Sequence, residues 1–134
     1  MLNTVRPFIF TTAPPPGTAA AALASLDIIQ REPERRARLW ANRNYVFSGL
    51  QRLGFRMTET VSPIIPILVG DAQRTLAFAE QLLAYGVYAS AIRPPTVPNE
   101  TSRIRVTVTS EHTTHQLDEA LRAFELAGRT SNLI

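Results

Sequence analysis

The chain has 134 residues, of which 45% are hydrophobic and 19% are charged, and its formal net charge is +3. This size and composition indicate one globular domain with enough apolar residues for a core. Its apolar runs are shorter than a membrane span requires, and the first residues lack the apolar stretch of a signal peptide. We therefore expect a cytoplasmic protein without a membrane partner.

Two residue types are missing from the sequence. Cysteine is absent, which excludes disulfides, thiolate metal ligands and a cysteine nucleophile. All 14 basic residues are arginine, so no side-chain amine can form a Schiff base with an aldehyde cofactor. The arginines are not interleaved with aromatic residues on a strand, and we expect no nucleic-acid partner.

Two helices are predicted in the N-terminal part of the chain. Residues 17–30 are rich in alanine, with larger apolar side chains at helical spacing. A second helix is predicted from about 32 to 53, because Pro33 suits a first turn and Gly54 suits the position after the last turn. Both helices need a surface to pack against, and a small sheet does not offer room for both. We therefore expect a partner surface.

Strands alternate with helices in the rest of the chain. Strands are predicted at 55–58, 64–69, 87–92 and 103–109. A helix that Asp71 caps should run to about residue 85, and Thr113 with Gln116 should form the capping box of a last helix. The order is two helices followed by β-β-α-β-β-α. This order predicts an α+β fold with a small mixed or antiparallel sheet, as one domain over residues 1–134.

Familiar catalytic and metal-binding motifs are absent. We find no GxGxxG, P-loop, GxSxG or HExxH pattern. His112 and His115 straddle a predicted helix start and have no third ligand at suitable spacing. We therefore interpret them as cap and surface residues, and expect no metal site.

A proline-rich loop and the strand after it form the one candidate binding site. Residues 93–98 contain three prolines, which stiffen the loop between two strands. Arg103 and Arg105 lie two apart, and thus on the same face of their strand. A guanidinium held on a strand can bind a carboxylate or phosphate with two hydrogen bonds. The alternative is that both arginines are solvated and keep this face soluble.

Four sequence blocks then suggest a family. They occur in this order: Arg-Pro-Phe-Ile-Phe-Thr-Thr-Ala at 6–13, Ser-Pro-Ile-Ile-Pro at 62–66, Ala-Ile-Arg-Pro-Pro-Thr-Val-Pro at 91–98 and Thr-Ser-Arg-Ile-Arg-Val-Thr at 101–107. Together they resemble the C-terminal third of the α-oxoamine synthases, which are fold-type-I enzymes dependent on pyridoxal phosphate (PLP). The third block most resembles the 8-amino-7-oxononanoate synthases of biotin synthesis.

The resemblance implies a fold, a reaction and partners. The chain would be the small C-terminal domain, which in this family packs on a large cofactor domain within a dimer. The intact enzymes condense an amino acid (alanine in the biotin pathway) with an acyl-CoA of pimeloyl type, and release CO₂ and CoA. The large domain, with its Schiff-base lysine, is missing from these residues, so we expect a fragment without a catalytic residue and without covalently bound PLP. The alternative is a non-catalytic truncated or docking domain that pairs with a separate PLP-binding chain.

Four residues take site roles from the resemblance. Thr11 and Thr12 match the pair that contacts the cofactor phosphate across the dimer. Thr96 matches a threonine at the substrate, and Arg105 matches the arginine that binds the amino-acid carboxylate. Without the resemblance, these residues would be interpreted as strand-end hydroxyls, a turn residue and a solvated arginine.

Overall fold

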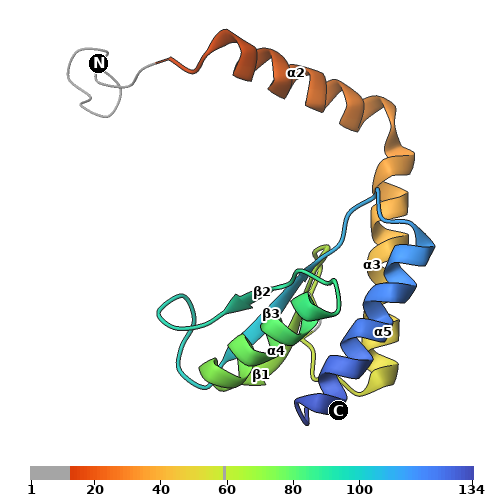
Figure 1. The fold of residues 1–134 in the computed structure, drawn as a ribbon. Coiled ribbons are helices and arrows are strands. Elements are labelled where there is room, and N and C mark those ends of the chain that lie inside the picture. The colour runs from red at the N-terminus through yellow and green to blue at the C-terminus, as the bar shows by residue number, and fades with distance from the viewer. Residues whose placement is uncertain (1–12, 59) are drawn as a thin grey trace, which may run out of the picture. The chain divides into compact units, whose positions relative to one another are not determined.

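The computed structural model describes residues 13–58 and 60–134, which form two compact units, 13–34 and 35–134. In chain order the elements are α2 (Pro16–Arg31), α3 (Pro33–Leu53), β1 (Ile64–Gly70), α4 (Ala72–Ala84), β2 (Ser90–Ile92), β3 (Ser102–Thr107) and α5 (Thr114–Thr130) (Figure 1). These helices and the small sheet confirm the predicted α+β class. Among the described residues, no helix combines the length and the hydropathy needed to cross a bilayer.

The first unit consists mainly of α2, a helix that buries no residue. Leu23, Leu26 and Ile29 are 69%, 56% and 48% exposed. The first eleven residues of the helix, 16–26, carry no charge. A helix that is apolar around most of its surface is normally covered on most sides. The partner surface expected for this helix remains a prediction.

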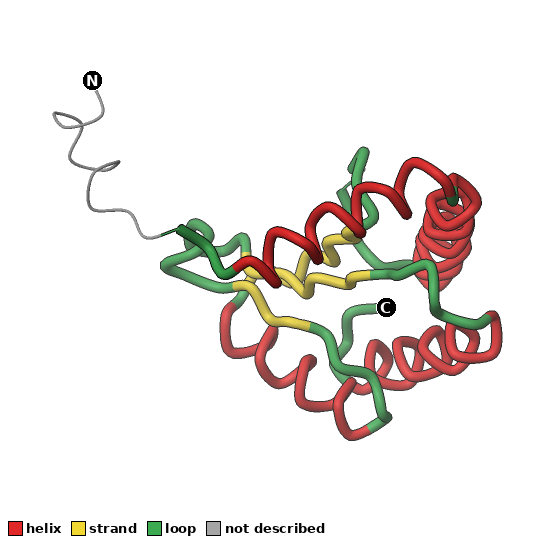
Figure 2. Tube along the Cα trace, turned by 90° about the horizontal axis from the view of Figure 1, so that it is seen from above, coloured by secondary structure: helices red, strands yellow, loops and turns green. Residues whose placement is uncertain are grey.

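The second unit is a three-stranded antiparallel sheet in the order β1-β3-β2, with helices packed on one face. Helix α4 contacts all three strands and also α5, and Figure 2 shows both helices along the same side of the sheet. Ile65, Ile67 and Ile104 point into this helical layer and are at most 1% exposed. The sequence predicted either a mixed or an antiparallel sheet, and both strand pairs are antiparallel.

Three phenylalanine rings form the centre of this core. Phe55 follows α3, Phe78 lies on α4 and Phe124 lies on α5, with ring centroids 5.9 to 6.2 Å apart. Phe78 and Phe124 are 0% and 1% exposed. The cluster therefore joins the end of α3 to the two helices that cover the sheet.

The predicted strand at 55–58 is wrong. It is reduced to a single bridge between Met57 and Ile67, on the outer edge of β1. Gly54 has a φ of 98°, which turns the chain out of α3, and Phe55 is buried in the ring cluster. Because Phe55 packs into the core, the extended segment that remains is too short to form a full ladder with β1.

The predicted helix caps are confirmed. The Asp71 side chain accepts a hydrogen bond from the Arg74 N–H at 2.7 Å. Thr113 and Gln116 form the reciprocal capping box, with hydrogen bonds of 3.3 and 2.9 Å. These two caps fix the starts of α4 and α5, because each provides an acceptor for otherwise unpaired N–H groups.

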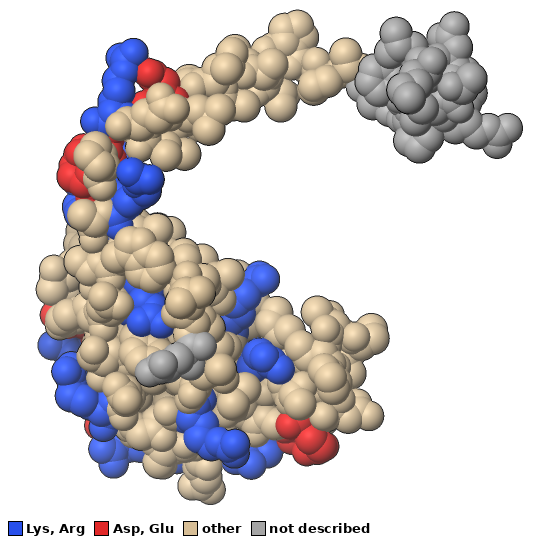
Figure 3. Space-filling view, turned by 180° about the vertical axis from the view of Figure 1, so that it is seen from behind, with Lys and Arg blue, Asp and Glu red and all other residues tan. Residues whose placement is uncertain are grey.

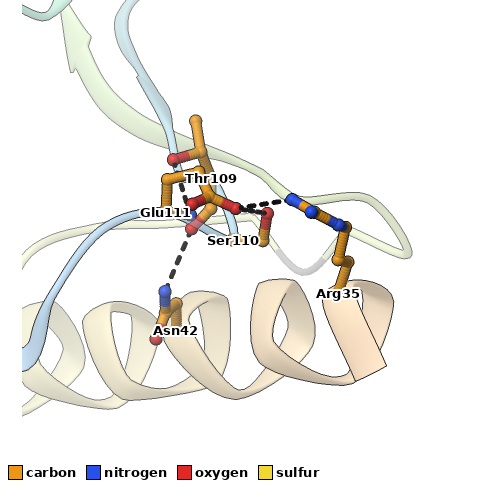
Figure 4. A network of polar contacts seen from close by, with 5 residues as sticks. All are labelled: Arg35, Asn42, Thr109, Ser110 and Glu111. Carbon is orange, nitrogen blue, oxygen red and sulfur yellow. Dashed lines mark hydrogen bonds and ion pairs between the residues drawn. The ribbon is translucent and has the colours of Figure 1, made fainter. Parts of the chain in front are cut away.

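Asn42 connects α3 to the segment between β3 and α5. Its side-chain amide donates hydrogen bonds to the carbonyl oxygens of Thr109 and His112, both at 3.0 Å. Close by, Arg35 forms an exposed ion pair with Glu111 at 3.3 Å (Figure 4). The amide is half-buried and supplies two donors to one turn, whereas the ion pair is exposed to screening. Asn42 is therefore the stronger of the two connections.

Replacement of Asn42 by alanine should lower the free energy of unfolding by ~1–2 kcal/mol, because two carbonyl groups lose their donor. Denaturant unfolding of the purified chain measures this change. Asn44→Ala is the matched control, because its side chain is exposed and, among the described residues, accepts a hydrogen bond from the adjacent Arg43 alone. Equal stability of the two variants would contradict this account of the connection.

Candidate functional site

Strand β3 carries Arg103, Arg105 and Thr107 on the side of the sheet that faces away from the helices. The residues between them point into the core, and Ile104 is 0% exposed. Arg105 and Thr107 are exposed, and Arg103 is half-buried. We call this side the arginine face. It comprises these three residues and their cross-strand neighbours Ile64, Pro66 and Leu68 of β1 and Ser90 and Ile92 of β2.

The direction of the β1 backbone groups determines how Arg105 meets its neighbours. The Leu68 N–H donates to the Arg56 carbonyl at 2.8 Å, away from β3. Pro66 lies two residues earlier, so its ring nitrogen also points away from β3. The missing N–H of this proline therefore removes no hydrogen bond between β1 and β3. By the same alternation, the N–H and C=O of Arg105 point toward β2. Arg105 and Ser90 are thus a directly hydrogen-bonded pair, with Cα atoms about 5.5 Å apart.

The two arginines of this face differ in their contacts. Arg103 Nε donates to the Thr101 carbonyl at 3.0 Å, and its cross-strand neighbours are Leu68 and Ile92. The side chain of Arg105 has no hydrogen bond or ion pair with any other residue that the structure describes. Among the described residues none occupies a donor of the Arg105 guanidinium, which leaves these donors available for an anion.

The loop after β2 begins at the edge of the arginine face. Ile92, the last residue of β2, pairs with Arg103, so the predicted loop 93–98 begins beside the arginine strand. The Thr96 N–H donates to the Arg93 carbonyl at 3.0 Å, which closes a turn, and the Thr96 side chain is exposed. Its predicted contact with a substrate remains a prediction. Thr11 and Thr12 lie outside the described residues.

The histidines have the roles predicted for them. His112 Nδ1 accepts the Thr109 N–H at 3.3 Å in the turn before α5. His115 is largely exposed and lies 3.3 Å from Glu119, one helical turn further along α5. Both residues act locally on the helix start, away from the arginine face.

Two hollows lie elsewhere on the second unit. One of about 640 Å³ is bordered by Tyr85, Tyr88 and the first half of α5. The other, of about 460 Å³, lies between α3 and α5, where Tyr45 Oη donates to Asp118 at 2.5 Å. This hydrogen bond raises the pKa of the Tyr45 phenol. Neither hollow is lined by Arg103 or Arg105. On the side of the molecule seen in Figure 3, the arginine side chains form separate patches.

Comparisons with known proteins identify the family. The profile of the aminotransferase class I and II family matches residues 1–124. The 8-amino-7-oxononanoate synthase of Symbiobacterium thermophilum is 46% identical over 96% of this chain, and the match covers 33% of that protein. The 8-amino-7-oxononanoate synthase 2 of Bacillus subtilis is 41% identical over 100% of this chain and 34% of its own length. A solved structure of serine palmitoyltransferase with PLP superposes with a TM-score of 0.92 at 35% identity, covering 98% of this chain and 34% of that one.

The chain belongs to the aminotransferase class I and II family. The resemblance to the α-oxoamine synthases, and to the 8-amino-7-oxononanoate synthases among them, is confirmed by these relatives. The chain spans about a third of the length of the curated relatives it matches.

The sequence alone did not single out Ser90. Its position beside Arg105 depends on the pairing register of β2 and β3, which no local sequence pattern specifies. The alternation of β3 did predict that Arg103 and Arg105 share a face. It could not predict that Arg103 donates to the Thr101 carbonyl, whereas the Arg105 side chain has no partner among the described residues.

Proposed function

We propose that this chain is the C-terminal part of a PLP-dependent acyltransferase of the 8-amino-7-oxononanoate synthase type. The complete enzyme would condense alanine with an acyl-CoA of pimeloyl type, and release CO₂ and CoA. The observation that carries the proposal is the guanidinium of Arg105 on the arginine face, which has no partner among the residues that the structure describes. It stands in a chain whose curated relatives bear that enzyme's name.

Arg105 would bind the carboxylate of the amino acid. Its planar guanidinium can donate two parallel hydrogen bonds, which fix both the position and the orientation of the carboxylate. The rigid antiparallel ladder on both sides of β3 supports this role, because it limits movement of the arginine's backbone. Thr96, whose hydroxyl is exposed in the loop after β2, would contact the same substrate from one side.

The chain fits one part of a PLP site. Arg105 would bind the substrate carboxylate, but the chain has no lysine and so cannot hold the cofactor covalently through a side chain. Thr11 and Thr12 would contact the cofactor phosphate, in keeping with the family resemblance. When bound, PLP supplies an electron sink for the α-carbon of the amino acid. The contribution of this chain would be to hold and orient the substrate beside that group.

The partner in this proposal is the rest of the enzyme, together with a second subunit. The chain spans about a third of its curated relatives, and α2 exposes Leu23, Leu26 and Ile29. A helix with this surface is stable in water when another surface covers it. We propose that a large cofactor domain and a homodimer partner provide this cover, in the cytoplasm.

The purified chain should not form a reducible covalent adduct with PLP on any side chain. Imine formation needs a primary amine, and only the N-terminal amine is present. Incubation with PLP, reduction with borohydride and peptide mass spectrometry measure this directly. A reduced PLP group attached to an internal residue would contradict the expectation.

The exposed surface of α2 favours a second function. The chain could be a non-catalytic domain that docks, through its exposed α2 helix, on a separate polypeptide that carries the lysine and the cofactor. The observation that favours it is the uncovered apolar surface of α2. The two functions differ in whether Arg105 contacts a substrate.

A chimaera tests the proposed function. Residues 1–134 would replace the matching C-terminal third of the Bacillus subtilis 8-amino-7-oxononanoate synthase 2, which aligns over all 134 residues. Expressed in a biotin auxotroph that lacks its own 8-amino-7-oxononanoate synthase, the chimaera should restore growth without biotin, and its Arg105→Ala variant should not. Equal growth with both would favour the docking function, because Arg105 would then have no substrate role.

A further inference from the structure

The arginine face contains one polar neighbour of Arg105 that has no assigned role. In the β2–β3 ladder Ser90 lies directly opposite Arg105, and in the β1–β3 ladder Pro66 lies opposite it on the other side. Residues opposite each other in an antiparallel pair share a face, with Cβ atoms about 4.5–5.5 Å apart. Of these two neighbours, only Ser90 has a side chain that can form a hydrogen bond.

The Ser90 hydroxyl is available for such a bond. It is half-buried, and it has no hydrogen-bond partner among the residues that the structure describes. The Arg105 guanidinium is also without a partner there. Two adjacent polar side chains without partners contrast with Arg103, whose neighbours are aliphatic and whose Nε is bound to the Thr101 carbonyl.

The geometry points to Ser90 as a positioning residue for Arg105. This inference rests on the proposed function, in which Arg105 binds the amino-acid carboxylate. The structure shows no hydrogen bond between the two side chains. In the proposed arrangement the Arg105 side chain turns toward Ser90, the Ser90 Oγ accepts its Nε–H, and both terminal nitrogens of the guanidinium are then directed at the carboxylate. An arginine stem has many rotamers, and ordering a long side chain costs free energy at each binding event. A hydrogen bond from Nε to a fixed strand position removes part of that cost before the substrate arrives.

The first test measures alanine kinetics in the chimaera. Ser90→Ala should raise the KM for alanine about 5- to 10-fold, as expected for the loss of one hydrogen bond of ordinary net strength, and should leave kcat within about twofold. Ser90→Thr keeps a hydroxyl at the same position and should restore most of the affinity. Thr107→Ala, on the same strand face but opposite Ile64, is the matched control and should behave as the parent.

A double substitution separates positioning from general stability. A lysine side chain lacks the Nε–H donor that Ser90 would accept. In an Arg105→Lys background, Ser90→Ala should therefore have no further effect on the KM for alanine. The same 5- to 10-fold loss in both backgrounds would show that Ser90 acts through the fold, and would overturn the inference. A KM unchanged by Ser90→Ala would also overturn it.

A second measurement uses the 134-residue chain without turnover. With acetate as the carboxylate probe, the NMR signal of the Arg105 Nε–H should exchange with water several-fold more slowly in the parent and in Ser90→Thr than in Ser90→Ala. Equal exchange in all three would contradict the inference. The kinetics of the chimaera separate failure of this inference from failure of the proposed function. If Arg105→Ala leaves the KM for alanine unchanged, the proposed function fails. If Arg105→Ala weakens binding and Ser90→Ala does not, only the role of Ser90 fails.

Discussion

Replacement of Arg105 by alanine in the chimaera should raise the KM for alanine about 30- to 1,000-fold, which corresponds to ~2–4 kcal/mol of lost binding free energy. In the proposed function the loss is large because the guanidinium would make two charge-assisted hydrogen bonds to one carboxylate, and the rest of the enzyme would partly shield them from water. Arg105→Lys should recover only part of it, because an ammonium group cannot reproduce the planar fork. Initial rates at varied alanine concentration give this result.

Arg103 provides the internal control for this prediction. It lies on the same strand face but donates its Nε–H to the Thr101 carbonyl and lies between aliphatic neighbours. Arg103→Ala should therefore leave the KM for alanine near that of the parent. If Arg103→Ala abolished binding and Arg105→Ala did not, the carboxylate site would be displaced by one strand repeat. If neither change mattered, the arginine face would be structural.

Replacement of Phe124 by alanine should lower the free energy of unfolding by ~3–5 kcal/mol. Phe124 is 1% exposed and meets the rings of Phe55 and Phe78 at centroid distances of 6.0 and 6.2 Å. Its loss leaves a cavity between α4, α5 and the end of α3 that the neighbouring rings cannot fill without moving. Urea unfolding of the 134-residue chain, followed by circular dichroism, measures the change.

The control for this prediction is an aromatic residue that lies outside the core. Tyr88 is 83% exposed, so Tyr88→Ala should change the free energy of unfolding by no more than about 0.5 kcal/mol. A similar loss of stability in both variants would mean that the three rings do not form the centre of the core.

Local signals in the sequence predicted much of this fold. The caps at Asp71 and Thr113 need only side chains within one helical turn, and both form as expected. The alternation along β3 also predicted the shared face of Arg103 and Arg105. These features depend on neighbours in the sequence, where residue type and spacing carry the information.

Features that depend on distant residues were less predictable. The strand expected at 55–58 is reduced to one bridge at Met57, because Phe55 turns into a core built by α4 and α5. The pairing of Ser90 with Arg105 depends on register, which the strands settle by packing their apolar sides against the helices. The roles of Thr11, Thr12, Thr96 and Arg105 came from the family resemblance, and they remain predictions.

The most direct test of the proposed function is CoA release by the purified chimaera. With PLP, alanine and pimeloyl-CoA, the free thiol of CoA should appear together with CO₂ in equal amounts, at a rate that depends on Arg105. The parent Bacillus subtilis enzyme serves as the positive control. A folded, dimeric chimaera that binds PLP but releases no CoA under conditions in which the parent does would contradict the proposal that this chain completes such an acyltransferase.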